Sequence, residues 1–296
     1  MATITHPRDE VADDEDLVEA PREDTGPKAP KWLYAVLSIG LVFMVVPFVW
    51  MLLSSIKPKG EIIQSPPTWL PAHPTLDNYS TLFSKLDLTT FFMNSLIVAV
   101  AVTLGNLVFC SMLGYALAKL EFAGRNALFA IVLGTLMIPG VVTFVPMFVL
   151  ASNLHLTNSL YGMILPFLVQ PFGVFLMRQY IGGLPDELIQ AARVDGASEF
   201  RIYWNVIVPL CGPAMATLGI LTFLGSWNNF LWPLVVAQQE DKFTLPVALA
   251  LYSIGQNSTD YGLLLAGSVV VVLPVIAVFL ALQRYFIQGI SMTGIK

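Results

Sequence analysis

The sequence predicts an all-α protein that crosses a membrane several times. Of its 296 residues, 56% are hydrophobic and only 12% are charged, which leaves too little polar surface to cover a soluble globule. Six stretches are long and apolar enough to cross a hydrocarbon core of roughly 30 Å, which takes about 20 residues. Lysine and arginine are also unequally distributed among the segments that connect these stretches, as in membrane proteins with a fixed orientation.

The first 30 residues form an acidic tail. They contain nine of the twenty acidic residues, all within the first 24 positions, together with four prolines. Such a segment cannot bury enough apolar surface to offset the entropy lost on ordering, so we expect it to be disordered. It also lacks the basic start and short apolar run of a secretory signal.

Residues 31–296 are expected to form one transmembrane domain of six spans. The fourth span contains Pro166, Pro171 and Gly173, and we expect it to be kinked or locally unwound, a geometry tolerated at membrane depth only inside protein or beside a cavity. The six expected spans cover approximately residues 32–54, 91–118, 127–150, 161–177, 208–235 and 261–283.

The distribution of basic residues predicts the orientation. With the amino terminus inside the cell, the cytoplasmic segments contain eleven lysines and arginines and the outer segments contain four, which agrees with the preference of basic residues for the cytoplasmic side. Both termini are then cytoplasmic. The proline-rich outer loop 55–90 is long enough to form a lid or a short helix.

Residues 184–207 interrupt the apolar pattern with a predicted pair of short helices. Pro185 at the first helical position suits a helix start, Gly196 can adopt the left-handed conformation that ends a helix, and Ser198 can cap the next one. Leu188, Ala191 and Ala192 share one face of the first helix, and the second helix has an aromatic and aliphatic face formed by Phe200, Tyr203, Trp204 and Ile207. Neither helix is long enough to span the membrane, so the segment projects into the cytoplasm.

This segment has four competing interpretations: a protein-docking element, a plain connecting loop, a pair of interfacial helices, or a DNA-reading helix–turn–helix. Residues 184–205 carry four acidic and two basic side chains. A net negative charge is poorly suited to an anionic leaflet or to reading DNA. We therefore favour a docking role and expect no nucleic-acid partner.

Several motifs resemble the permeases of binding-protein-dependent ABC importers. The string "QAARVDGAS", followed by "IVPL" and Pro213, is similar to their cytoplasmic Glu-Ala-Ala loop, and "LTFLGSWNNFLWPL" with "QRYFIQGISMTGIK" is similar to the MalG-like, carbohydrate-uptake branch. The resemblance covers residues 32–296. It implies a bacterial inner-membrane protein with a second permease subunit, a separate ABC ATPase dimer that binds ATP and Mg²⁺, and an extracellular or periplasmic solute-binding protein.

The same resemblance implies two contacts with the ATPase. The coupling loop would contribute Glu187, Gln190, Ala191, Ala192, Asp195, Gly196, Ala197 and Ser198, and the carboxyl-terminal tail would contribute Gln288, Gly289, Gly294 and Lys296. Two positions depart from the family pattern, because Gln190 replaces the usual glutamate and Asn229 the usual aspartate. Gln190 can hydrogen-bond but cannot form an ion pair, which Asp186 or Glu187 can provide instead.

Polar residues inside spans are costly and commonly face a cavity. The candidates for the substrate pathway are Asn94, Asn106, Gln170, Asn228 and Asn229, with Trp227 and Trp232 as aromatic surfaces for a sugar ring. The alternative is that the tryptophans form an interfacial belt and that the asparagines join helices.

Other functions fit the sequence less well. No Gly-x-x-x-x-Gly-Lys-Ser/Thr string occurs, and the three histidines lie in the tail or the outer loops, so we expect neither ATP hydrolysis nor intramembrane catalysis by this chain. Cys110 and Cys211 lie in apolar runs and indicate neither a disulfide nor a metal site. The remaining alternatives are an importer for another solute, such as glycerol phosphate or a polyamine, and a six-span secondary transporter.

Overall fold

A computed structural model describes residues 30–254 and 259–291, with side chains up to residue 281. Within these residues the secondary structure is helical, apart from an isolated bridge between Ile254 and Thr259. The predicted all-α class is therefore confirmed. The chain divides into two compact units between Pro47 and Phe48. The division falls within α1 (Lys31–Ser55).

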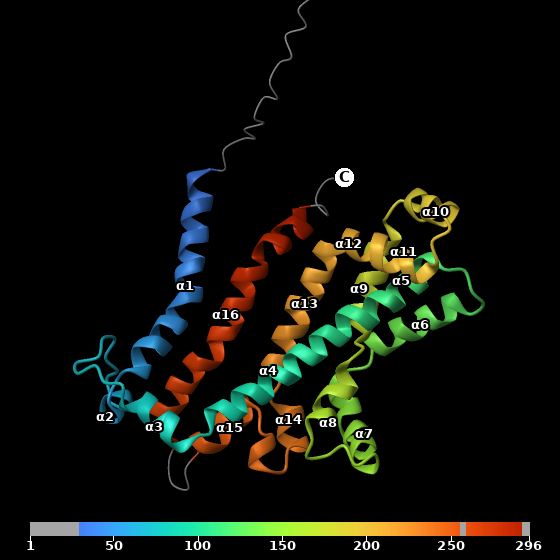
Figure 1. Ribbon diagram of the computed structural model, residues 1–296. Coiled ribbons are helices and arrows are strands. Elements are labelled where there is room, and N and C mark those ends of the chain that lie inside the picture. Colours follow the sequence, from blue (N-terminus) through green and yellow to red (C-terminus); the bar gives the residue numbers. More distant parts are fainter. Residues whose placement is uncertain (1–29, 255–258, 292–296) are drawn as a thin grey trace, which may run out of the picture. The chain divides into compact units, whose positions relative to one another are not determined.

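Four helices are long and apolar enough to cross a membrane without a sharp bend: Lys31–Ser55, Leu88–Lys119, Leu160–Gly182 and Tyr261–Ala281. The second of these, which we call the α4–α5 helix, consists of α4 (Leu88–Gly105), a π-helical turn η1 (Asn106–Cys110) and α5 (Ser111–Lys119). Figure 1 shows it as one continuous rod. The last is part of α16 (Tyr261–Ser291).

Two further candidates are bent pairs of helices. α6 (Arg125–Leu136) and α7 (Gly140–Asn153) meet at 103°, and the segment Glu199–Leu210 meets α13 (Gly212–Trp227) at 80°. The first bend precedes Pro139, which lacks the N–H needed to continue the helix. The number of candidate spans among the described residues reaches the predicted six if each bent pair is counted as one span. The fifth predicted stretch, 208–235, also ends at Trp227 and resumes as α14 (Leu231–Val236).

The predicted break in the fourth stretch is confirmed. α8 (Leu160–Ile164) passes into a 3₁₀ turn, η2 (Leu165–Phe167), and α9 (Pro171–Gly182) begins after three residues that are not helical. Pro166 and Pro171 occupy starting positions of their helices, where a missing N–H costs little. The break exposes backbone groups that need partners from other helices.

Short helices lie at the two ends of the second unit (Figure 1). At one end are α2 (Lys59–Ile62), α3 (Asp77–Lys85), α14, η4 (Glu240–Lys242) and α15 (Leu245–Ser253). At the opposite end are α10 (Asp186–Val194), α11 (Glu199–Ile202), the π-helical turn η3 (Tyr203–Ile207) and α12 (Val208–Leu210). The expected short helices in the loop 55–90 are therefore present as α2 and α3.

Close packing of α5 on α9 fixes the centre of the unit. A Cβ atom on Gly114 would lie 2.7 Å from Met177 Cβ and 2.9 Å from the backbone nitrogen of Arg178. No side chain fits there, so the two helices can approach closely only because residue 114 is glycine. Met177 is fully buried in the same cluster as Ile189 and Ile202, which connects this contact to α10 and α11.

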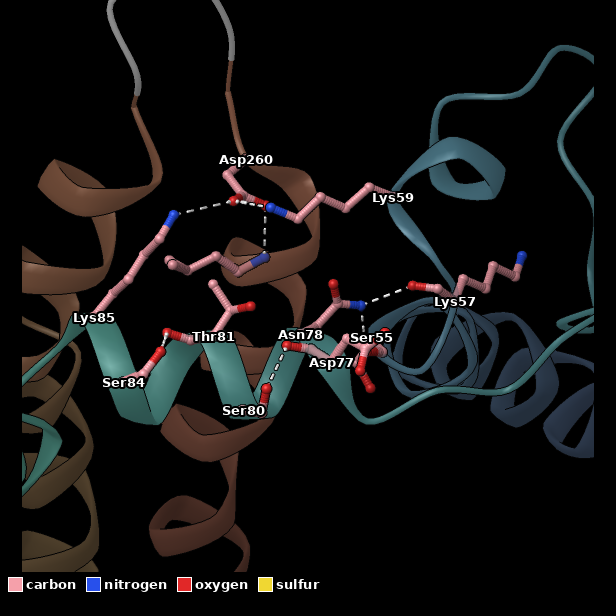
Figure 2. A network of polar contacts seen from close by, with 11 residues as sticks. Ser55, Lys57, Lys59, Asp77, Asn78, Ser80, Thr81, Ser84, Lys85 and Asp260 are labelled. Atoms are coloured by element: carbon pink, nitrogen blue, oxygen red, sulfur yellow. Dashed lines mark hydrogen bonds and ion pairs between the residues drawn. The ribbon is translucent and has the colours of Figure 1, made fainter.

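A polar cluster closes the end that carries α3 (Figure 2). Asn78 donates from Nδ2 to the carbonyl oxygens of Ser55 and Lys57, at 2.9 and 2.8 Å. Asp260 Oδ1 accepts from the backbone N–H of Leu263 at 3.1 Å, and Oδ2 accepts from Lys59 Nζ at 2.7 Å. The cluster thus joins α1, α3 and the start of α16, which are far apart in the sequence.

Candidate functional site

The segment 184–207 folds into the predicted pair of short helices. Gly196 has a φ of +77°, in the left-handed region that favours glycine. Ser198 caps α11 by accepting from the backbone N–H of Arg201 at 3.4 Å. α10 begins at Asp186, so Pro185 directly precedes the helix instead of occupying its first position. We call α10 and α11 together the helical hairpin.

One face of the hairpin is buried and the other is exposed. Ile189 and Ile202 are 3% and 0% exposed and belong to the core cluster that includes Met177. On the opposite side, Leu188 and Val194 are 44% and 87% exposed. The predicted face therefore needs a correction: Ala191 is exposed, but Ala192 is half-buried and packs against the core cluster. The predicted face of the second helix is likewise divided between buried and exposed residues: Tyr203 and Ile207 are buried, whereas Phe200 and Trp204 are exposed.

The other residues expected in the coupling loop lie on the same hairpin. Ala197 is half-buried against the core cluster, and the remaining ones are exposed: Glu187, Gln190, Asp195, Gly196 and Ser198. Gln190 also borders a small polar hollow with Lys119, Arg125 and Arg193. Most of the expected coupling residues are therefore exposed on the surface of the hairpin.

Two ion pairs hold the back of the hairpin. Lys119 Nζ lies 2.5 Å from Asp186 Oδ1 and 2.6 Å from the carbonyl oxygen of Leu184. Glu199 accepts from Arg193 Nε at 2.7 Å and from the Tyr115 hydroxyl at 2.5 Å. Sequence reasoning did not identify these contacts. The only available signal was that Tyr115 and Lys119 are four residues apart and therefore share a helix face.

The expected tail contact with the ATPase falls largely outside the described structure. Gln288 and Gly289 belong to α16, but their side chains are not described, and Gly294 and Lys296 lie beyond the described residues. Among the residues that are described, no group of three His, Cys, Asp or Glu side chains is arranged to hold a metal ion.

A cavity of about 190 Å³ lies between the α4–α5 helix, the broken segment α8–α9 and α13–α14. Its polar lining comes from Gln170, Ser226 and Asn229, and its aromatic lining from Phe167 and Trp232; the other lining residues are Val98, Val102, Met163, Gly225 and Pro233. No lining residue is charged. Within the described part of the chain, the side chains of Gln170 and Ser226 make no hydrogen bond, so they remain able to bind a polar solute.

Asn106 supports the wall of this cavity without lining it. Its fully buried side chain donates from Nδ2 to the carbonyl oxygen of Phe167 at 2.7 Å and accepts at Oδ1 from the backbone N–H of Gln170 at 3.2 Å. These are backbone groups that the break between η2 and α9 leaves without helical partners. Asn106 is therefore a structural residue at the break, although the sequence alone placed it among the pathway candidates.

The other pathway candidates lie away from the cavity. Asn94 is 7% exposed and donates to the carbonyl oxygens of Asp241 and Phe243, at 2.9 and 3.0 Å. Trp227 is 1% exposed and donates from Nε1 to the carbonyl oxygen of Val271 at 2.9 Å. Asn228 is exposed and donates only to its own helix, at Leu224. The two remaining polar candidates, Gln170 and Asn229, both line the cavity.

Trp232 combines two roles. It is 2% exposed, donates from Nε1 to the carbonyl oxygen of Gly162 at 3.0 Å, and packs edge-on against Phe144 and Phe167. It lines the cavity at the same time. Its ring is therefore held rigidly, as a binding surface for an apolar face requires.

Comparison with known proteins assigns the chain to a family. The sequence pattern of the family described as "Binding-protein-dependent transport system inner membrane component" matches residues 110–292. The chain is 43% identical to the arabinooligosaccharides transport system permease protein AraQ of Halalkalibacterium halodurans, over 90% of this chain and 96% of that protein. It is 35% identical to the diacetylchitobiose uptake system permease protein NgcG of Streptomyces coelicolor, over 87% of this chain and 86% of that protein.

A solved structure agrees with these sequence relatives. A chain of a bacterial ABC transporter involved in the import of the acidic polysaccharide alginate superimposes with a TM-score of 0.78 at 25% identity. The superposition covers 86% of this chain and 95% of that chain. The protein described here therefore belongs to the family of inner-membrane components of binding-protein-dependent transport systems.

Proposed function

We propose that the chain is a permease subunit of an ATP-driven importer that moves a sugar, as a mono- or oligosaccharide, into the cytoplasm. A solute-binding protein outside the membrane would deliver the sugar. The observation that carries this proposal is the cavity, which offers uncharged amide and hydroxyl groups beside a fixed aromatic ring. The names of the relatives AraQ and NgcG support it from the sequence side.

The chain is a multi-pass membrane protein and the pore component of its transporter, not an enzyme. Its family works with an ATPase and a solute-binding protein. We assign binding of ATP and Mg²⁺ to a separate ATPase dimer and expect a second permease subunit to complete the pathway as a heterodimer. Closure of the ATPase around ATP would then switch the pathway between its inward-open and outward-open states.

The helical hairpin is the proposed docking site for the ATPase. Its exposed face combines Leu188, Ala191 and Val194 with acidic side chains at its start and end. An apolar exposed face with a polar rim is typical of protein interfaces. We therefore place the hairpin, and both termini, in the cytoplasm, and α2, α3 and α15 on the outer side where the solute-binding protein approaches.

The chemistry of the cavity favours a neutral sugar over the alternative solutes. A glycerol phosphate site needs cationic side chains to offset the charge of the phosphate, and a polyamine site needs carboxylates for the ammonium groups. The cavity lining has neither type of charge. A sugar needs hydroxyl-binding amides and an apolar ring surface, which Gln170, Asn229 and Trp232 provide.

The proposal is tested by reconstituting the chain with its ATPase, the second permease and the binding protein in vesicles. We expect ATP-dependent accumulation of the sugar that the purified binding protein binds. Gln170→Leu should reduce uptake by about tenfold, because a sugar hydroxyl would lose its partner in the cavity. Gln179→Leu is the matched control, since Gln179 lies on α9, which begins directly after Gln170, but is exposed and pairs with Arg178.

Two results would contradict the proposal. Uptake that continues without ATP but follows an ion gradient would identify a secondary transporter. Equal uptake by the Gln170→Leu and Gln179→Leu variants would show that the cavity is not on the sugar's path, and that the second permease holds the site. Purified alone, the chain should hydrolyse no ATP.

A further inference from the structure

The last two turns of the α4–α5 helix present two polar side chains to the hairpin. Tyr115 is 4% exposed and the Lys119 side chain is 6% exposed. Because they are four residues apart, they lie one above the other on the same face of α5. Burying a lysine is costly unless its ammonium group is fully bonded, so its partners are part of the architecture.

Each of these two side chains binds the first turn of a different hairpin helix. Lys119 contacts Asp186 at the start of α10, and Tyr115 contacts Glu199 at the start of α11, both at 2.5 Å. Arg193, in the last turn of α10, binds the other oxygen of Glu199 at 2.7 Å. The two helices of the hairpin are thus joined to each other and to one face of α5.

Apolar packing reinforces this attachment. Ile189 of α10 and Ile202 of α11 belong to one buried cluster with Tyr115 and Leu117 of α5. Moving the hairpin away from α5 would expose two isoleucines as well as break two charged contacts. Exposing buried apolar surface to water is unfavourable, so the two isoleucines oppose this movement in addition to the charged contacts.

The same α4–α5 helix also holds the wall of the cavity. Asn106, in its π-helical turn, binds the backbone of Phe167 and Gln170, and both of these residues line the cavity. The hydroxyl of Tyr203, which follows α11 directly, lies 2.7 Å from Ser111 Oγ and donates to the carbonyl oxygen of Val108 at 3.4 Å. The π-helical turn is therefore connected both to the hairpin segment and to the break in the fourth span.

We propose that Tyr115 and Lys119 are positioning residues that make the α4–α5 helix move together with the hairpin as one rigid body. Movement imposed on the hairpin would then reach the cavity through Asn106 and the backbone of Phe167 and Gln170. This inference rests on the proposed function in one respect, the docking of the ATPase on the hairpin. The opposite arrangement is a hairpin that pivots on its connecting residues 183–185 while the α4–α5 helix stays in place.

Distance measurements between spin labels distinguish the two arrangements. Labels are placed on Ala123→Cys, just after α5, and on Arg201→Cys in α11, both at exposed positions, in a chain whose Cys110 and Cys211 are replaced by Ala. The full complex is compared without nucleotide and after trapping with ATP, Mg²⁺ and vanadate. A second pair of labels on the two ATPase subunits reports that the ATPase has closed.

We expect the distance between positions 123 and 201 to be the same in both states of the otherwise unmodified chain. In a chain with Tyr115→Phe and Lys119→Met, the distribution in the trapped state should broaden by roughly twofold, because the hairpin no longer has a fixed position on α5. Tyr161→Phe, an exposed tyrosine remote from the hairpin, is the matched control and should leave the distribution narrow.

Rescue separates a specific contact from general damage. Lys119→Glu alone should broaden the distribution, and Lys119→Glu combined with Asp186→Lys should narrow it again. A changed 123–201 distance in the otherwise unmodified chain while the ATPase closes would overturn the proposal, as would a narrow distribution in the Tyr115→Phe and Lys119→Met chain. Absence of vanadate-trapped closure in the unmodified complex would instead contradict the proposed function.

Discussion

The two ends of the second unit handle their polar and apolar groups differently. At the end that carries α3, Lys57 is 1% exposed: its ammonium group donates to the carbonyl oxygen of Thr68 and lies 4.6 Å above the ring of Trp50. Asn78 binds the carbonyl oxygens of Ser55 and Lys57, and Asp260 binds the ammonium group of Lys59 (Figure 2). At the hairpin end, ion pairs attach Asp186 to α5 and join Arg193 to Glu199, and Val194 on the front is 87% exposed.

This difference assigns a structural role to the α3 end, which we call the closed end, and a docking role to the hairpin end. The described polar groups at the α3 end are bound together by contacts within the chain, although this end also exposes apolar side chains such as Leu70 and Phe83. The hairpin end is held in place from behind but offers an apolar front, which a water-exposed surface tolerates poorly unless a partner covers it. The comparison therefore predicts large binding effects from the front of the hairpin, and stability effects from residues in the interior and at the closed end.

The largest effect is expected on the front of the hairpin. Ala191→Asp would bury an unpaired carboxylate against the ATPase, and leaving such a charge without a partner costs about 3–5 kcal/mol, a weakening of a hundredfold or more. ATPase binding is measured with the detergent-solubilised permease pair, whose assembly should be unchanged. Ala123→Asp, at an exposed position of the same end outside the hairpin, is the control. Equal binding by the two variants would remove the docking role.

Replacing a buried residue in the interior should lower stability without weakening ATPase binding, as at the closed end. Asn106→Leu leaves the carbonyl of Phe167 and the N–H of Gln170 without their partner, and a buried polar group left unsatisfied costs about 1–3 kcal/mol. We expect a lower thermal unfolding midpoint of the permease pair in detergent, with ATPase binding retained. Asn153→Leu, at the exposed end of α7, is the control. An unchanged midpoint for Asn106→Leu would show that the break in the fourth span does not depend on this side chain.

The turn of the hairpin gives a smaller effect. A β-branched residue at position 196 meets the cost of the left-handed conformation, on the order of 1–2 kcal/mol, so Gly196→Val should weaken ATPase binding about 5–30-fold. Gly182→Val is the control, because no atom lies within 4 Å of a Cβ at position 182 and the glycine has an ordinary backbone conformation. If the two variants bind the ATPase equally well, the left-handed turn is not needed for docking.

The sequence predicted those features that depend on local patterns. Apolar runs located the long helices, proline and glycine located the break around Pro166 and Pro171, and Gly196 and Ser198 located the turn and the cap of the hairpin. The bend of 103° between α6 and α7 was not predicted. Pro139 at the bend was visible in the sequence, but residues 127–150 form one apolar run whose hydropathy shows no break.

Contacts between distant residues explain most of what the sequence did not show. Trp227 and Asn94 looked like pathway residues because polar and aromatic side chains in a span are unusual, but each binds a backbone carbonyl of a segment distant in the sequence. The partners of Lys119 and Tyr115 lie 67 and 84 residues away. A single sequence gives no measure of such pairings, whereas the i,i+4 spacing of Tyr115 and Lys119 was visible and could have indicated a shared face.

The smallest effect is expected at the closed end, where Asp260 should make stability depend on pH. Partial burial by itself raises the pKa of Asp260, but hydrogen bonds from Lys59 and from the N–H of Leu263, with the charges of Lys59 and Lys85, hold it below its usual value. A carboxyl group whose pKa is lower in the folded state adds stability that is complete above its unfolded pKa of about 3.9 and is lost as the pH falls through the folded value. The two lysines are more than half exposed, so the contribution is small.

Thermal unfolding of the detergent-solubilised permease pair between pH 7 and pH 3 measures this effect. The unmodified chain should lose stability more steeply below pH 4 than Asp260→Asn, which retains the shape but cannot titrate. Asp77→Asn is the matched control, because Asp77 is an exposed carboxylate at the same end and its replacement should leave the steep loss in place. Parallel pH profiles for the unmodified chain and Asp260→Asn would show that the ion pairs of Asp260 add nothing to the closure of this end.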